Sequence, residues 1–259
     1  MAGEYQDCSI LFPLPSMFCF RKESPPSLTC IKYSTMCGRF AQTTPPEDLV
    51  RIFDLASTLH SNTRFNIAPT QPIVTIRGHA NGRHAHICRW GFVPSWAKDL
   101  KIGNKMINAR SETIFEKRSF AHAAQHQRCV VPASGFYEWR ETPAGKMPTL
   151  FTPTSGPIFR FAGLWSSWTD PQGELIYTAT ILTTQANSVM APFHHRMPIF
   201  LDDEATHKWL DPRNTDPEQL KPILKTPEED STRLRAVSKR VNNVRNDDPK
   251  CWDNATSPQ

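Results

Sequence analysis

The chain's 23 prolines, spread along 259 residues, constrain its fold more than any other feature of the sequence. Proline has no backbone N–H group and its ring clashes with the preceding helical turn, so it interrupts helices and the interiors of sheets. We therefore expect many loops and extended segments rather than a helical bundle. A hydrophobic content of 39% with 21% charged residues is ordinary for a soluble globular protein. No apolar run approaches the ~20 residues that a membrane-spanning helix needs, so no membrane association is expected.

Strand signals outnumber helix signals along most of the chain. Runs bounded by turn residues predict strands over 72–77, 84–90, 129–131, 135–139, 149–152, 158–165, 175–184 and 234–237. The pattern Thr44-Pro-Pro-Glu47 is typical of a capping box and predicts a helix over 45–56. Further helices are expected over 113–127, capped by Ser111, and over 202–210 and 216–224. This balance indicates the α+β class: a single β-rich domain, built as a distorted barrel or two packed sheets with peripheral helices.

Both ends of the chain differ from its middle. Residues 1–35 show no sustained helical or strand period and carry as many acidic as basic groups, so we interpret them as a disordered extension or an incorrectly assigned start. The formal net charge of +5 then lies entirely in the remainder, which slightly favours a polyanionic partner. We expect one domain over 36–246 and a polar, disordered tail over 247–259.

The seven cysteines form no Cys-x-x-Cys pair, and their odd number argues against a disulfide framework. A reducing intracellular compartment is expected, nuclear or cytoplasmic, and not secretion. His84, His86 and Cys88 alternate along a predicted strand, an arrangement that can hold a metal. Because no partner cluster is evident, we interpret them as a mixed polar face and expect no metal and no cofactor.

The pair Met36-Cys37 looks like a protein start placed late in the chain. If Cys37 became the first residue, it would carry an amine and a thiol on adjacent carbons, with reference pKa values of about 8 and 8.5. Inside a longer chain the same nitrogen is a planar amide and is not nucleophilic. The alternative interpretation of such a pair is a buried structural thiol.

Six separated segments share a recognisable pattern. They are Cys37-Gly-Arg-Phe40, Phe65-Asn-Ile-Ala-Pro69, Trp90-Gly-Phe-Val-Pro-Ser-Trp96, Asn108-Ala-Arg-Ser-Glu112, Gly135-Phe-Tyr-Glu-Trp139 and His194-His-Arg-Met-Pro198. In this order they resemble the SOS-response-associated peptidase (SRAP) family of abasic-site processing proteins, over Cys37 to about Asn243. The resemblance implies that the initiator methionine is removed and that the exposed cysteine bonds covalently to abasic DNA. Its amine would form an imine with the C1′ aldehyde, and its thiol would close a thiazolidine ring.

The resemblance also implies catalytic roles for four residues. Cys37 is the nucleophile, and Glu138, flanked by two aromatic residues that could exclude water and raise its pKa, is the principal acid/base group. His194 matches the family's His-x-Arg-Met-Pro pattern and would open the sugar ring or protonate the departing oxygen. Asn108 would position the amine and the sugar through its amide. Without the resemblance, these would be interpreted as ordinary structural or solvated residues.

Arginines and aromatic residues are the candidate contacts to DNA. The family uses the arginines of the first and fourth motifs against the phosphate backbone. Trp90 is as well suited to stack on unpaired bases, or to wedge at a single-strand to duplex junction, as to pack in the core. Core packing is favoured for Trp96, and Asn66 and Pro69 are expected to shape the pocket wall beneath the cysteine. The candidate DNA-binding residues are Arg39, Asn66, Pro69, Trp90 and Arg110.

Three functions are compatible with these residues. The first is a DNA-damage protein, monomeric by default, that crosslinks to abasic sites in single-stranded DNA through Cys37 after residues 1–36 are removed. Translation from Met36 is the favoured route, and strand cleavage by a lyase reaction would be a side activity. The second is a self-cleaving, SRAP-type thiol peptidase. The third is a non-covalent single-strand binder that keeps the extension and loses its complex in denaturant or salt.

Overall fold

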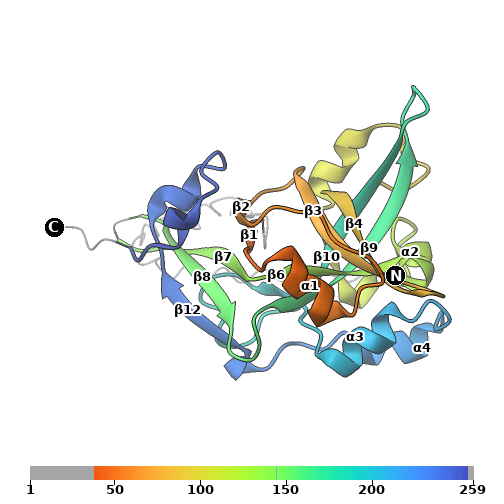
Figure 1. Ribbon diagram of the computed structural model, residues 1–259. Helices are drawn as coiled ribbons and strands as arrows, with labels where there is room; N and C mark the ends of the chain where they lie inside the picture. Colours follow the sequence, from red (N-terminus) through yellow and green to blue (C-terminus); the bar gives the residue numbers. More distant parts are fainter. Residues whose placement is uncertain (1–37, 144, 256–259) are drawn as a thin grey trace, which may run out of the picture. The chain divides into compact units, whose positions relative to one another are not determined.

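Five long strands close into a barrel within the described part of the chain, residues 38–143 and 145–255 of the computed structural model (Figure 1). β10 closes the barrel because it pairs in parallel with β4 and antiparallel with β9. The remaining pairs, β4–β3, β3–β6 and β6–β9, are antiparallel. The barrel strands are β3 (Pro72–His79), β4 (Gly82–Trp90), β6 (Arg128–Ala133), β9 (Phe159–Thr169) and β10 (Leu175–Gln185).

Two three-residue strands extend the barrel along the carboxyl half of β10. β5 (Asn108–Arg110) runs parallel to β10. β11 (Arg196–Pro198) runs antiparallel to it, with Pro198 opposite Thr183. β10 therefore holds two segments that lie far apart in the sequence.

A second, five-stranded sheet has the order β12-β8-β7-β1-β2, and all of its neighbouring strands are antiparallel. Only Ser134 separates β6 of the barrel from β7, so the two sheets are covalently joined at this point. The strands of the second sheet are β1 (Phe40–Gln42), β2 (Arg64–Ile67), β7 (Gly135–Arg140), β8 (Met147–Pro153) and β12 (Thr232–Ala236).

Aromatic side chains from both sheets pack together in one buried cluster. The rings of Phe40 and Trp90 meet edge to face with 5.1 Å between their centres, and Phe136 stacks on Phe151 at 4.8 Å. Each such pair contributes about 0.5–1.5 kcal/mol beyond the burial of its surface. This packing fixes β1 against the barrel.

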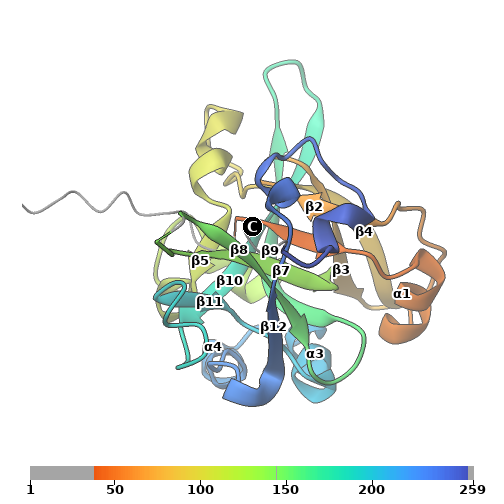
Figure 2. The ribbon, with the colours of Figure 1, turned by 90° about the vertical axis from the view of Figure 1, so that its left-hand side faces the viewer.

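Short helices lie outside the strands (Figure 2). A second buried cluster packs these helices against the barrel. It includes the fully buried Leu49 and Phe53 of α1 and Trp209 of α3. The α+β class, β-rich with a barrel, a second sheet and peripheral helices, is therefore confirmed. The α-helices are α1 (Pro46–Phe53), α2 (Ala121–His126), α3 (Asp203–Leu210) and α4 (Pro217–Leu220), and the 3-10 turns are Leu100–Lys105, Ser111–Thr113, Lys221–Ile223, Glu229–Ser231, Lys239–Asn242 and Pro249–Trp252.

The predicted strands correspond to β3, β4, β6, β7, β8, β9, β10 and β12. Four further strands, β1, β2, β5 and β11, were not predicted. They have three or four residues each, too few to show an alternating pattern. Each of these four overlaps one of the six motifs.

Two helix predictions are wrong in detail. Thr44 does not cap α1, because Pro45 occupies the N-cap position and the Thr44 hydroxyl lies 3.0 Å from that of Ser134. Of the helix predicted over 113–127, only α2 is α-helical. The preceding residues form a 3-10 turn and further turns, through which Ile114 and Phe120 still reach the core.

The segment after Asn246, expected to be disordered, is folded as far as Ala255. Cys251 is fully buried, and Trp252 packs edge-on against Phe65 of β2 with 5.7 Å between ring centres. The prediction failed because the partners of this polar segment lie about 180 residues earlier in the chain, for instance 182 residues for the bond between Phe65 and Asp247.

Residues 1–35, predicted to be an extension, and 256–259 lie outside the described residues. Within the described ranges, no helix is both long enough and apolar enough to cross a membrane.

Candidate functional site

The chain that follows Cys37 is anchored on β7. Phe40 pairs with Phe136, and Tyr137 donates its backbone N–H to Arg39 O at 3.0 Å. Continuing this antiparallel register puts Gly38 opposite Glu138. Cys37 itself lies outside the described residues, and Gly38 is the first residue described.

Glu138 is a buried carboxylate on β7, with 5% of its surface exposed. Because side chains alternate across a strand, it faces away from Tyr137 and Trp139 and lies on the side of Phe136, which belongs to the aromatic cluster. Glu138 is thus shielded from water, but not by the two flanking aromatic residues from which the shielding was expected. A shielded carboxylate is suited to proton transfer, and the acid/base role stays a prediction.

His194 lies between β10 and β11, and the backbone orients its imidazole. Its Nδ1 accepts the N–H of Arg196 at 3.0 Å, so a neutral His194 carries its proton on Nε2. The preceding Phe193 packs edge to face on Phe151 of β8, with 5.1 Å between ring centres. Since β8 neighbours β7, this contact brings the His194 turn to the sheet that carries Glu138.

β5 places the fourth motif beside β10. Asn108 pairs with Ile181 and Arg110 with Thr183, so the Asn108 and Arg110 side chains share one face of the strand. Asn108 is partly buried. Arg110 is exposed, and none of the ion pairs between described residues includes it. The same half of β10 also pairs with β11, so the Asn108 strand and the segment after His194 are held by one strand.

Arg39 is a partly buried guanidinium whose partners among the described residues are all uncharged. Its Nη1 donates to Asn66 Oδ1 at 2.8 Å and to Val241 O at 2.7 Å. Its Cζ lies 5.6 Å from the centre of the Trp139 ring. Burial lowers the pKa of Arg39. A cation held in this way, by neutral groups alone, favours the approach of an anion such as phosphate.

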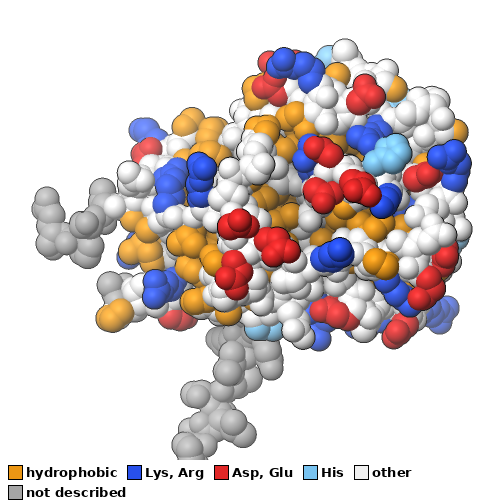
Figure 3. All heavy atoms as spheres, turned by 90° about the horizontal axis from the view of Figure 1, so that it is seen from below, with side chains coloured by type: hydrophobic (Ala, Val, Ile, Leu, Met, Phe, Trp, Pro, Cys, Tyr) orange, Lys and Arg blue, Asp and Glu red, His pale blue; other side chains and the backbone are white. Residues whose placement is uncertain are grey.

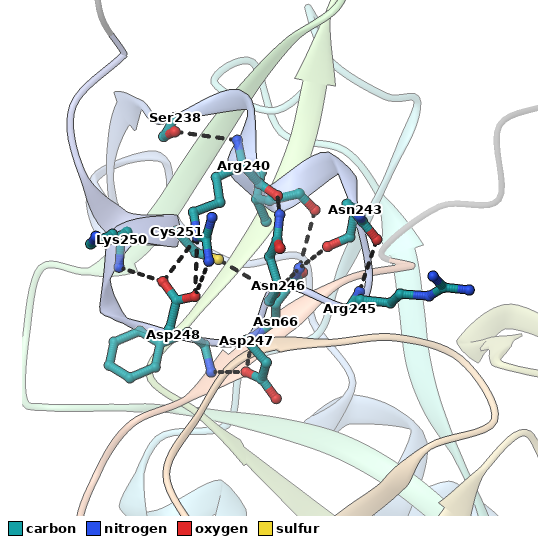
Figure 4. Close-up of polar contacts among 12 residues, drawn as sticks. Asn66, Ser238, Arg240, Asn243, Arg245, Asn246, Asp247, Asp248, Lys250 and Cys251 are labelled. Atoms are coloured by element: carbon teal, nitrogen blue, oxygen red, sulfur yellow. Dashed lines mark hydrogen bonds and ion pairs between the residues drawn. The ribbon is translucent and has the colours of Figure 1, made fainter.

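Asn66 is fully buried, and its amide is used inside the protein (Figure 4). Its Nδ2 donates to the carbonyl oxygens of Val241, Asn243 and Asn246 at 3.2, 3.0 and 2.6 Å. Asn66 is therefore wrong as a direct DNA contact, because its donors point to protein carbonyls. Pro69 is partly exposed between β2 and β3 and stays a candidate.

The two tryptophans of the third motif differ in burial: Trp90 takes the core position, one of the two alternatives left open for it, and Trp96 does not take the core position expected for it. Trp90 is fully buried, and its indole N–H donates to Ile107 O at 2.9 Å, so it cannot stack on bases. Trp96, expected in the core, is 50% exposed, and the Arg118 guanidinium lies 5.2 Å from its ring centre. Trp96 therefore has the exposed ring that base stacking needs.

Two structural links were missed by the sequence analysis. Arg196 forms a two-bonded ion pair with Glu112, at 2.5 and 2.8 Å, which ties the sixth motif to the fourth. The sequence signal that could have predicted this pair was the presence of one acidic and one basic residue, Glu112 and Arg196, in two of the motifs. Asp247 binds backbone N–H groups of β2, and its polar surroundings in the sequence offered no such signal.

Among the residues that the structure describes, no group of three or more His, Cys, Asp or Glu side chains is arranged to hold a metal ion. On the face that carries His84, His86 and Cys88, the Arg77 Nη2 lies 2.8 Å from the buried Cys88 sulfur. His86 Nε2 lies 3.3 Å from His79 Nε2. Burial, followed by the charge of Arg77, lowers the pKa of His86 to about 4.

A cleft of about 630 Å³ lies on the face that carries α3, where acidic and basic side chains surround apolar ones (Figure 3). Its lining includes Asp202, Asp203 and Glu204, and none of the candidate residues. Glu228 and the basic residues Arg160, Lys208 and Lys225 also line it, so charges of both signs are mixed there and no positive field favours a polyanion. This cleft is therefore separate from the candidate site.

The sequence of this chain is similar to those of known proteins. Residues 36–244 match the SOS response associated peptidase (SRAP) family. The chain is 41% identical over 219 residues to the abasic site processing protein YoqW of Bacillus subtilis (strain 168), covering 83% of this chain and 98% of that protein. It is 36% identical over 187 residues to the abasic site processing protein HMCES of Gallus gallus, covering 63% of this chain and 55% of that protein.

Solved structures give the same picture of the fold. A protein from Bacteroides thetaiotaomicron superposes with a TM-score of 0.77 at 25% identity, over 85% of this chain and 100% of that one. A phage-related protein from Bordetella bronchiseptica superposes with a TM-score of 0.63 at 30% identity, over 78% of this chain and 94% of that one.

Proposed function

This chain belongs to the SRAP family, and from that premise we propose that it processes abasic sites in DNA by attaching itself to them through Cys37. The α-amine of Cys37 condenses with the C1′ aldehyde of the opened sugar and releases one water. The thiol then adds across the resulting imine and closes a thiazolidine, with no oxidant or metal required. Both bonds need a free amine, so the reactive form begins at Cys37.

Arg39 carries this proposal. It stands two residues after Cys37 and holds a positive charge with only neutral partners among the described residues. A DNA phosphate would supply the missing negative charge and bring the sugar next to the chain terminus. Arg110, exposed and outside every ion pair between described residues, is a second phosphate contact in this proposal.

Glu138 and His194 would move the protons. The buried carboxylate of Glu138 accepts a proton from the attacking amine, and the Nε2–H of His194 donates to the departing sugar oxygen. Asn108 orients the amine and the sugar. The proposed substrate is single-stranded DNA, because unpaired bases leave the sugar accessible. The protein would act as a monomer inside the cell.

The test compares the 259-residue chain with a chain that begins at Met36. Each is analysed by intact mass and N-terminal sequencing, mixed with single-stranded DNA that carries one abasic site, and run on a denaturing gel. A chain that starts at Cys37 should give a shifted band that survives denaturant, and DNA of the same sequence without the abasic site should not.

Two controls separate the other functions. Cys37→Ala should lose the band, and loss of a fixed mass over time from the 259-residue chain, absent in Cys37→Ala, would indicate self-cleavage. A chain that starts at Cys37 yet forms only a complex that dissociates in denaturant would overturn the covalent proposal and leave a non-covalent binder.

A further inference from the structure

Asp247 joins the C-terminal segment to β2. Its Oδ1 accepts the backbone N–H groups of Phe65 and Asn66 at 2.6 and 2.9 Å, and its Oδ2 accepts from Arg64 Nε. β2 is an edge strand of the second sheet, where N–H groups lack a neighbouring strand. The Asp247 carboxylate accepts the two N–H groups in place of a neighbouring strand, and so fixes the backbone of Asn66.

Asn66 passes this constraint on to Arg39. Its Oδ1 accepts from Arg39 Nη1 at 2.8 Å. Its Nδ2 binds carbonyl oxygens of the C-terminal segment, those of Asn243 and Asn246 (Figure 4) and that of Val241. The same Val241 carbonyl accepts from Arg39 Nη1. The guanidinium is thus held between β2 and the segment that Asp247 fastens to β2.

The Trp139 ring completes the enclosure. It lies beneath the Arg39 guanidinium, and its indole N–H donates to Asn242 Oδ1 at 2.7 Å. Each group that contacts Arg39 therefore belongs to the segment 241–247, as Val241 does, or is hydrogen-bonded to it, as Asn66 and Trp139 are.

We propose that Asp247 is a positioning residue: by fastening this segment to β2, it holds the Arg39 guanidinium where the DNA phosphate binds. The inference rests on the proposed function in one respect, that Arg39 contacts the DNA backbone. Asp247 itself touches neither DNA nor the reacting atoms.

Asp248 supplies a matched control. It is the next residue, of the same type, and pairs with Arg240 while accepting the N–H of Lys250. All of these partners lie within the C-terminal segment, and none lies on β2. Replacing Asp248 therefore perturbs the segment without releasing β2.

The experiment measures equilibrium binding of the 259-residue chain to a labelled oligothymidylate of about 15 nucleotides without an abasic site, at several salt concentrations. Arg39→Ala should weaken binding roughly three- to tenfold and reduce the slope of log K against log salt by about 0.7, the contribution of one phosphate on a single strand. Asp247→Ala should do the same, and Asp248→Asn should match the wild type. The double variant Arg39→Ala/Asp247→Ala should bind no more weakly than Arg39→Ala, because both changes remove one contact.

Each other outcome overturns a defined part of the argument. If Arg39→Ala lowers the slope and Asp247→Ala keeps the wild-type slope, Asp247 has only a structural role and the inference is wrong. If Arg39→Ala itself leaves the slope unchanged, the phosphate contact in the proposed function is wrong and the inference fails with it. Should Asp247→Ala not fold, Asp247→Asn decides. Its Nδ2 takes the place of the oxygen that accepts from Arg64 Nε, so that donor meets donor and the amide fastens the segment to β2 more weakly. A slope below that of Asp248→Asn supports the inference, and an equal slope overturns it.

Discussion

Gly91 and Gly103 meet so closely that a Cβ on Gly91 would lie 2.6 Å from the carbonyl oxygen of Gly103. Gly91 also has a φ of 129°, which L side chains rarely adopt, and its N–H donates to Ala179 O of β10 at 2.8 Å. Glycine is therefore required at position 91 for two reasons, the close contact with Gly103 and the positive φ. It fixes the start of the loop that carries Trp96 to the barrel.

We expect Gly91→Ala to lower the free energy of unfolding by about 2–4 kcal/mol, because it adds a steric clash to a strained backbone. Urea unfolding measures this. Gly156, with a φ of 71° and open space around its Cβ position, is the control. Gly156→Ala should cost only about 1 kcal/mol, and equal losses would contradict the role of the close contact.

The ion pair of Glu112 and Arg196 should make stability depend on pH. The hydrogen bonds that Glu112 accepts from Arg196 lower the pKa of the Glu112 carboxyl below its ordinary value of 4.5. A carboxyl whose pKa is lower in the folded state stabilises the fold above the unfolded pKa, and this stabilisation is lost as pH falls through the folded value. Glu112→Gln should therefore be less stable than wild type at pH 7, with the difference shrinking below about pH 4.5.

Urea midpoints between pH 7 and pH 3 test this, with the exposed Glu116→Gln as the control. A difference between Glu112→Gln and wild type that stays constant with pH would show that the ion pair is not its source.

The two tryptophans of the third motif should respond in opposite ways. Trp90→Phe removes a buried indole and its hydrogen bond to Ile107 O, which keeps only the backbone N–H of Ile181. It should cost about 2 kcal/mol of stability and leave the DNA affinity of the folded protein unchanged. Trp96→Ala should leave stability nearly unchanged and weaken oligothymidylate binding by about 1–3 kcal/mol, the worth of one stacked base. The reverse pattern would favour base stacking, the other alternative left open for Trp90.

Asn66→Asp should release the C-terminal segment. The substituted carboxylate would face the carbonyl oxygens of Val241, Asn243 and Asn246 with no proton to donate, at a cost of about 3 kcal/mol. Hydrogen exchange should show faster amide exchange over 238–254 than in wild type, with the barrel strands unaffected. Unchanged protection of 238–254 would mean that Asp247 and Trp252 suffice to hold the segment.

The sequence predicted the long elements and missed the ones that assemble the site. Strands such as β9 and β10 have 11 residues each, enough to show a pattern. β1, β2, β5 and β11 owe their conformation to pairing partners elsewhere in the chain, so local propensity carried no signal for them. The resemblance of the six motifs to a known family identified the candidate site residues. Their contacts with residues outside the motifs could be found only from the fold.

Burial was equally hard to predict from local sequence. Trp90 and Trp96 belong to one short motif, yet one lies in the aromatic cluster and the other is exposed, because the turn at Gly91 redirects the chain between them. Asp247 looked like part of a polar tail. Its function in the fold depends on free N–H groups of an edge strand 182 residues away, and no local pattern reveals such partners.

The contact between Arg39 and Val241 spans 202 residues. A ribosome makes Val241 202 residues after Arg39, so the guanidinium lacks this contact until that length of chain has been added. Contacts of such long range also form late in folding, because a large loop must close before they contribute. Arg39 is thus held in place only after a segment 202 residues later has joined the fold, and a truncated product that ends before Val241 lacks an organised Arg39.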